Sequence, residues 1–101
     1  MSYSHTFLDG SPCPLPVGKV VCVGRNYAAH ARELGNAVPE TPILFLKPAT
    51  ALVPLSPSFA IPAGRGGCHH ETEVTVLIGQ ILKNASEAEC RAAMVGITLG
   101  L

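Results

Sequence analysis

The sequence lacks several features that would place a protein in a functional class at once. Its 101 residues carry seven basic and seven acidic side chains, so no net charge favours nucleic acid or an anionic membrane surface. The N-terminal segment has neither the basic nor the apolar part of a secretory signal, and no later apolar run reaches membrane-spanning length. We therefore expect a cytoplasmic protein that binds neither nucleic acid nor membrane.

Paired cysteines and a phosphate-binding loop are missing as well. The four cysteines are irregularly spaced and include no C-x-x-C pair, which predicts reduced and mostly buried thiols. Residues 64–67 lack the GK[ST] ending of a phosphate-binding loop and precede a strand-like run instead of a helix. We interpret them as a flexible connection.

The composition is that of a folded chain that is unusually apolar for its size. Hydrophobic residues make up 48% and charged residues 14%, and the mean hydropathy is +0.35. These values exclude a disordered chain, and the length allows one small domain at most. The excess of apolar residues predicts that the chain buries surface against something else.

The pattern of residues predicts an α+β chain that is mainly β, with two short helices. Prolines and glycines make residues 1–17 an extended lead-in to a domain over residues 18–101. Strands are expected at 19–23, 43–46, 70–78 and 97–101, and edge strands with turns at 51–62.

The two helices are expected where capping residues precede helical segments. Asn26 is the predicted cap of a helix over residues 27–34 that Gly35 terminates. Ser86 and Glu89 form the S-x-x-E capping box of the second helix, which should run to about Met94 and stop at Gly96.

The segment around Glu71 and Glu73 is a candidate metal site. On a strand, residues two apart share a face, so the two carboxylates should lie side by side, where a hard cation such as Mg²⁺ or Mn²⁺ would offset their repulsion. A solvated face of an edge strand explains the same pattern. A zinc site of Cys68, His69 and His70 is a weaker alternative, because neighbouring strand residues point to opposite faces.

The segment GRNYAAHARE is a candidate base and anion site. His30 and Glu33 lie three residues apart on the predicted helix, so the carboxylate can orient the imidazole and raise its basicity. Arg25 and Asn26, at the turn before the helix, are suited to a carboxylate substrate. A solvent-facing helix with ordinary capping residues is the alternative for both.

The segment GKVVCVGRNYAAHARELGNAVPETPILFLKPATALV, followed by HHETEVTVLIG, resembles the fumarylacetoacetate hydrolase family, and specifically its acylpyruvate hydrolase and oxaloacetate decarboxylase-like branch. The resemblance covers residues 18–101. It implies that Glu71 and Glu73 are ligands of Mg²⁺ or Mn²⁺ and that His30 and Glu33 form the catalytic dyad. It also places Arg25, Asn26, Tyr27 and Lys47 near the substrate.

The resemblance further implies a fold and an activity. The fold would be the N-terminal portion of the family's mixed β-sandwich or β-roll, and the full-length protein a homodimer. The activity would be metal-dependent cleavage of a carbon–carbon bond in a 2-oxo acid, by acylpyruvate hydrolysis or oxaloacetate decarboxylation. Isomerisation or decarboxylation of 2-hydroxyhepta-2,4-diene-1,7-dioate in aromatic catabolism, and a non-catalytic fragment, are the alternatives.

The end of the sequence departs from the family pattern. Family members follow a segment like Gly96–Leu101 with an aspartate that is the third metal ligand, and later with a catalytic lysine and a substrate loop. The present sequence ends at Leu101, so we expect a truncated chain that is inactive when isolated.

Overall fold

The computed structural model describes residues 3–35 and 40–101, except for the side chains of Ala28, His30 and Ala31. The chain divides into two compact units, Met1–Phe59 and Ala60–Leu101. No helix in the described ranges is long and apolar enough to cross a membrane.

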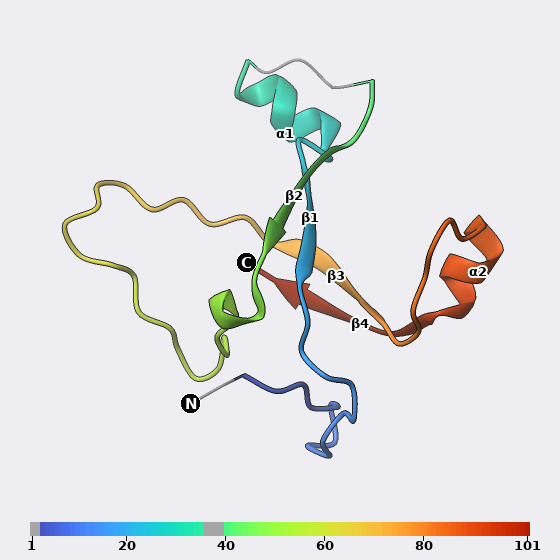
Figure 1. Cartoon of the computed structure of the whole chain (residues 1–101). Helices are drawn as coiled ribbons and strands as arrows, with labels where there is room; N and C mark the ends of the chain where they lie inside the picture. Colours follow the sequence, from blue (N-terminus) through green and yellow to red (C-terminus); the bar gives the residue numbers. More distant parts are fainter. Residues whose placement is uncertain (1–2, 36–39) are drawn as a thin grey trace. The chain divides into compact units, whose positions relative to one another are not determined.

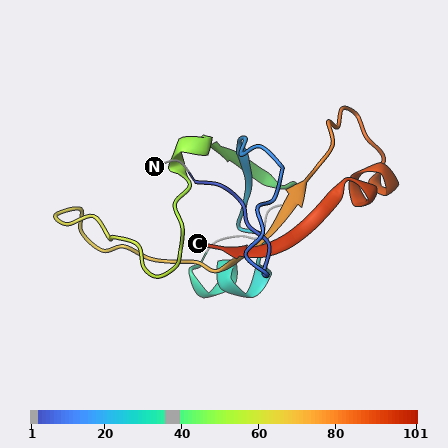
Figure 2. The ribbon, with the colours of Figure 1, turned by 90° about the horizontal axis from the view of Figure 1, so that it is seen from below.

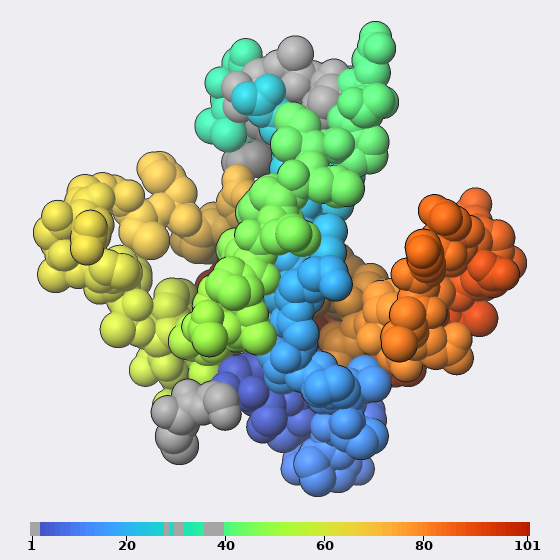
Figure 3. Space-filling model, viewed as in Figure 1, coloured from blue at the N-terminus to red at the C-terminus, as the bar shows by residue number. Residues whose placement is uncertain are grey.

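The first unit is built on one antiparallel strand pair. Strand β1 (Val20–Gly24) pairs with β2 (Ile43–Lys47), from Val20 opposite Lys47 to Gly24 opposite Ile43. Figure 1 shows the pair with helix α1 (Ala28–Glu33) following the end of β1, and Figure 3 shows the two strands in contact along their length, in blue and green. Both strands lie within one residue of the predicted ranges.

Helix α1 is shorter than predicted by one residue at each end. It begins at Ala28, so Asn26 lies one residue further from the first helical turn than a capping residue would. Gly35 has a φ of +73°, and its N–H donates to the carbonyl of Arg32 over 3.0 Å. This left-handed residue ends the helix as expected, because glycine adopts the conformation without steric cost.

The prediction of edge strands in residues 51–62 is wrong. The segment begins with the end of a single 3-10 turn, η1 (Ala49–Ala51), and contains no strand. Pro54, Pro57 and Pro62 cannot donate a backbone hydrogen bond, which disfavours strand pairing in this segment.

The second unit is a β-hairpin-like pair interrupted by a helix. Strand β3 (Glu73–Ile78) pairs antiparallel with β4 (Met94–Gly100), and helix α2 (Glu87–Ala92) lies in the connection between them. Figures 1 and 2 both show α2 at the end of the strand pair away from the C-terminus. Strand β3 starts three residues later than predicted.

The predicted capping box of α2 is present. The hydroxyl of Ser86 accepts a hydrogen bond from the N–H of Glu89 at 3.1 Å, and the Glu89 carboxylate accepts one from the N–H of Ser86 at 3.0 Å. The predicted helix end is wrong, because α2 stops at Ala92 and Gly96 lies inside β4. Met94 pairs with Ile78 instead of extending the helix, and the register shifts between Leu77 and Ile78, as it does at a β-bulge.

The described residues form almost no buried core. Only Ala93 is fully buried among them; its N–H bonds to α2 carbonyls and its own carbonyl accepts from the N–H of Gly79 over 2.9 Å. The four cysteines are free, as expected, but the prediction of buried thiols is wrong: Cys68 is exposed and the others are half-buried. A sheet of two strands has too little surface to cover them.

Candidate functional site

The turn after β1 holds an unusual backbone conformation. Arg25 has a φ of +53°, in the left-handed region that a residue with a Cβ adopts at a cost on the order of 1–3 kcal/mol. Such conformations persist where surrounding structure requires them, often at functional sites. The side chains of Arg25, Asn26 and Tyr27 are all exposed at this turn, so they are available to a ligand.

Helix α1 carries both residues of the predicted dyad. His30 and Glu33 lie within Ala28–Glu33, so their spacing of three residues is helical, as the base-dyad hypothesis requires. The Glu33 side chain is exposed, whereas the side chain of His30 lies outside the described part of the structure. Their mutual contact therefore stays a prediction.

Lys47 lies at the far end of the same strand pair. It is opposite Val20, whereas the Arg25 turn follows Gly24, which is four steps further along the ladder, or about 13 Å. Lys47 is exposed and is the last residue of β2, as the sequence predicted. A ligand that contacts both ends must extend along the ladder, or the long Lys47 side chain must reach back.

The register of β3 and β4 sorts the second unit into two chemically different faces. Directly opposite residues in an antiparallel pair share a face. The polar face is defined by three pairs: Glu73 with Gly100, Thr75 with Thr98, and Leu77 with Gly96. The apolar face is defined by the other three: Val74 with Leu99, Val76 with Ile97, and Ile78 with Met94.

Of the two predicted metal ligands, the structure places Glu73 on the polar face. Glu73 is half-buried and is the first residue of β3, whereas Glu71 is exposed and precedes the strand. Strand alternation therefore does not extend to Glu71, and the shared orientation of the two carboxylates stays a prediction. A Cβ at Gly100, opposite Glu73, would lie 2.8 Å from the Thr75 hydroxyl oxygen, so glycine avoids a close contact with Thr75 on this face.

The donor set suits a hard divalent cation but is small. Carboxylate oxygens are the ligands that Mg²⁺ and Mn²⁺ prefer, and Glu71 and Glu73 supply two such groups. No group of three or more His, Cys, Asp or Glu side chains that could hold a metal occurs in the described ranges. This finding also fails to support the zinc alternative of Cys68, His69 and His70.

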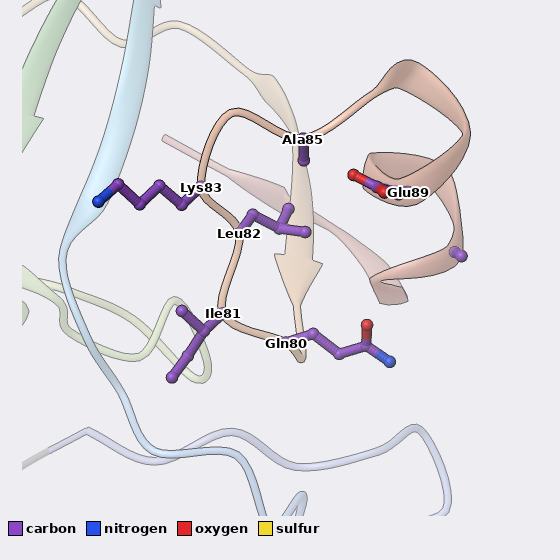
Figure 4. A pocket seen from close by; sticks show the side chains of 7 residues that line it. Gln80, Ile81, Leu82, Lys83, Ala85 and Glu89 are labelled. Carbon is purple, nitrogen blue, oxygen red and sulfur yellow. The ribbon is translucent and has the colours of Figure 1, made fainter.

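A hollow in the second unit is lined by residues of that unit alone. It has a volume of about 270 Å³ and is lined by the loop before α2 and by α2 itself. Figure 4 shows the side chains of Gln80, Lys83 and Glu89 around it. It contains none of the predicted catalytic, substrate-binding or metal-binding residues.

Sequence reasoning missed two features of these surfaces. The left-handed conformation of Arg25 has no sequence signal, because such a φ is expected of glycine or asparagine. The position of Thr75 on the face of Glu73 follows from strand alternation and could have been predicted, but the clearance that Gly100 provides depends on the register with β4.

Comparisons with known proteins show which family the chain is similar to. The family model described as "Fumarylacetoacetate (FAA) hydrolase C-terminal" matches residues 19–101. Oxaloacetate tautomerase YcgM of Escherichia coli is 50% identical over 99 residues, which are 98% of this chain and 45% of that protein. The human mitochondrial oxaloacetate tautomerase FAHD1 is 43% identical over 82 residues, covering 81% of this chain and 37% of the relative.

Solved structures give the same result. A fumarylacetoacetate hydrolase family protein from Yersinia pestis matches with a TM-score of 0.91 and 44% identity, over 96% of this chain and 45% of that one. The chain thus spans less than half the length of the relatives it matches. The small antiparallel sheets of this chain match the fold of these neighbours, and the chain belongs to the fumarylacetoacetate hydrolase family.

Proposed function

We propose that this chain supplies the dyad and two metal ligands of an enzyme that tautomerises oxaloacetate or a related 2-oxo acid with Mg²⁺ or Mn²⁺. The observation that carries the proposal is the 50% identity, over 98% of the chain, to a protein named oxaloacetate tautomerase. Two further relatives with this name, from Arabidopsis thaliana and Bos taurus, are 49% and 44% identical.

Glu71 and Glu73 are the residues that would hold the divalent ion. Glu73 lies half-buried at the start of β3, opposite Gly100, and Glu71 precedes it by two residues. The ion, when bound, would bind the 2-oxo acid and stabilise the negative charge that develops on its carbonyl oxygen.

His30 and Glu33 would move the proton. Tautomerisation of oxaloacetate requires a proton to leave or join carbon 3 while another leaves or joins the oxygen on carbon 2. An imidazole has an ordinary pKa near neutrality and can therefore do either, and a carboxylate three residues along the helix can orient it. The Glu33 side chain is exposed, so a small substrate can reach its carboxylate.

Arg25, Asn26, Tyr27 and Lys47 are proposed to bind the substrate carboxylates. The guanidinium of Arg25 follows β1 in a left-handed turn, and its planar donors suit a carboxylate. The Lys47 ammonium, at the other end of the ladder, is suited to a second carboxylate of a dicarboxylic acid. Oxaloacetate has two carboxylates, but it is shorter than the separation of these two positions along the ladder, so the long side chains of Arg25 and Lys47 would have to reach toward each other to bind both.

Carbon–carbon cleavage is a second candidate activity. The family description names a hydrolase, and acylpyruvate hydrolysis or oxaloacetate decarboxylation would develop charge on the same oxygen as tautomerisation. In the hydrolysis, His30 assisted by Glu33 would deprotonate water for attack on the distal carbonyl. The complete enzyme is proposed to be a mixed β-sandwich or β-roll in which residues 18–101 form part of the catalytic domain, a proposal supported by the solved relatives.

A chimera tests the activity in a complete domain. The chain replaces the matching region of the Escherichia coli relative, and the loss of the ultraviolet absorbance of enol oxaloacetate measures tautomerisation. We expect Mg²⁺-dependent turnover that Glu73→Gln abolishes, while pyruvate release measures the cleavage alternative. A folded chimera that is inactive on oxaloacetate and on acylpyruvates would contradict the proposal.

A further inference from the structure

Thr75 is the neighbour of Glu73 on the polar face of the second unit. Along β3 the side chains of Glu73, Thr75 and Leu77 are half-buried, whereas those between them are exposed. Residues two apart on a strand share a face, so the Thr75 side chain follows directly after that of Glu73 on this face. A hydroxyl group therefore stands next to the carboxylate that is proposed to bind the ion.

The hydroxyl of Thr75 is directed toward the Glu73 end of the polar face. Thr75 lies directly opposite Thr98, and Glu73 lies directly opposite Gly100. A Cβ built on Gly100 would lie only 2.8 Å from the Thr75 hydroxyl oxygen, which is closer than Cβ atoms approach such groups in proteins. The oxygen is therefore turned along the ladder toward the pair that contains Glu73.

Glycine at position 100 is compatible with this orientation, whereas a larger residue would oppose it. A Cβ there would press against the hydroxyl, and the Thr75 side chain would have to turn into another rotamer. Gly100 itself gives no side chain to the polar face opposite Glu73. The polar group that β3 and β4 place beside the Glu73 pair is thus the hydroxyl of Thr75.

We propose that Thr75 is a positioning residue for Glu73: its hydroxyl donates a hydrogen bond to the Glu73 carboxylate and holds that group in the orientation that the divalent ion requires. The inference rests on the proposed function, because it takes Glu73 as a metal ligand. Carboxylates that bind metal ions are oriented by hydrogen bonds from neighbouring groups, and loss of such a bond lowers metal affinity about ten- to hundredfold.

Strand formation is the competing explanation for a threonine at this position. Threonine favours strands, and threonine pairs stabilise neighbouring strands when they lie opposite each other, as Thr75 and Thr98 do. Valine has a similar shape and also favours strands, but it has no hydroxyl to donate. Thr75→Val therefore removes the proposed hydrogen bond while it preserves the preference for a strand.

Calorimetric titration of Mn²⁺ into the chimera measures the effect without catalysis. Thr75→Val should weaken Mn²⁺ binding about tenfold, and Thr75→Ser, which keeps a hydroxyl, should restore most of the parent affinity. Thr98→Val is the matched control, because it makes the same chemical change on the same face, at the residue directly opposite Thr75. It should bind Mn²⁺ as the parent does.

Circular dichroism verifies that each variant keeps the fold of the parent, and Thr75→Ala gives the same comparison if Thr75→Val does not fold. Parent-like binding by Thr75→Val, while Glu73→Gln binds weakly, would overturn the role of Thr75 and leave the metal site intact. Equal losses in Thr75→Val and Thr75→Ser, or in Thr75→Val and Thr98→Val, would also overturn it. Parent-like binding by Glu73→Gln would instead contradict Glu73 as a ligand, and with it the proposed function.

Discussion

At the scale of single residues, the proposed chemistry depends on the dyad of α1. In the chimera, His30→Ala or Glu33→Ala should lower turnover by about a hundred- to ten-thousand-fold, because general base catalysis contributes that much. The affinity for Mn²⁺ should change little, since neither residue is a proposed ligand. Steady-state kinetics and calorimetry measure the two effects.

Arg32→Ala is the control for the dyad, because Arg32 lies on the same short helix and has an exposed side chain. It should retain most of the turnover. Near-normal rates in both dyad variants would remove His30 and Glu33 from the mechanism.

Asp9 gives a prediction about pH that is independent of catalysis. Its carboxylate accepts hydrogen bonds from the hydroxyl and the N–H of Ser11, and these bonds lower the pKa of Asp9 below its usual value of 3.8. A group whose pKa is lowered by folding stabilises the fold above its unfolded value. The contribution is then lost as the pH falls through the lowered value.

The turn around Gly10 should therefore loosen only in strongly acidic solution. The amide signal of Ser11 in an NMR titration should shift with a midpoint below 3.8. Asp9→Asn should remove this transition. A midpoint at or above the usual value would show that the hydrogen bonds to Ser11 do not persist in solution.

At the scale of elements, α2 depends on its capping box. Ser86→Ala removes the acceptor for the N–H of Glu89 and should cost the helix about 0.5–2 kcal/mol. Hydrogen exchange at the amide of Cys90, which bonds to the carbonyl of Ser86, should speed up accordingly. Ser86→Asp should retain the cap, so equal exchange in the Ala and Asp variants would contradict the assigned role.

The elements show how far local sequence could predict this structure. The capping box, the glycine stop after α1 and the strands β1 and β2 depend on neighbouring residues, and these predictions were confirmed within a residue. The start of β4 depends on pairing with β3 across the bulge at Ile78, which no local pattern encodes. The sequence pattern, which predicted that the second helix stops at Gly96, therefore gave the wrong end for α2 and the wrong start for β4.

The candidate site was predictable to a smaller extent than the elements. The repeat of a helix predicted that His30 and Glu33 lie on one helix face, and the alternation of a strand predicted that Glu73 lies opposite the apolar side chains of β3. Both repeats are fixed by backbone geometry and can be read from the sequence. The position of Glu71 before β3 and the left-handed backbone of Arg25 did not follow from any period. They depend on where tertiary contacts begin and end.

At the scale of the whole molecule, the small number of carboxylates predicts weak metal binding by the isolated chain. Two carboxylates without a third anionic partner are a poor site for Mg²⁺, which sheds water reluctantly, and no cluster of three ligands occurs in the part of the chain that is described. Calorimetry of the 101-residue chain with Mn²⁺ should show affinity weaker than micromolar. Binding near about −8 kcal/mol, together with turnover, would contradict this prediction.

The central claim, that Glu71 and Glu73 hold the divalent ion of a 2-oxo acid enzyme, is tested most directly by titrating Mn²⁺ into the chimera. The parent is compared with Glu71→Gln, Glu73→Gln and the control Glu87→Gln, whose carboxylate pairs with Arg91 on exposed α2 at 2.7 Å. We predict that each of the first two substitutions weakens Mn²⁺ binding at least about tenfold, since a neutral amide replaces an anionic ligand, and that the control binds as the parent does. Unchanged Mn²⁺ affinity in both Glu71→Gln and Glu73→Gln would contradict the claim.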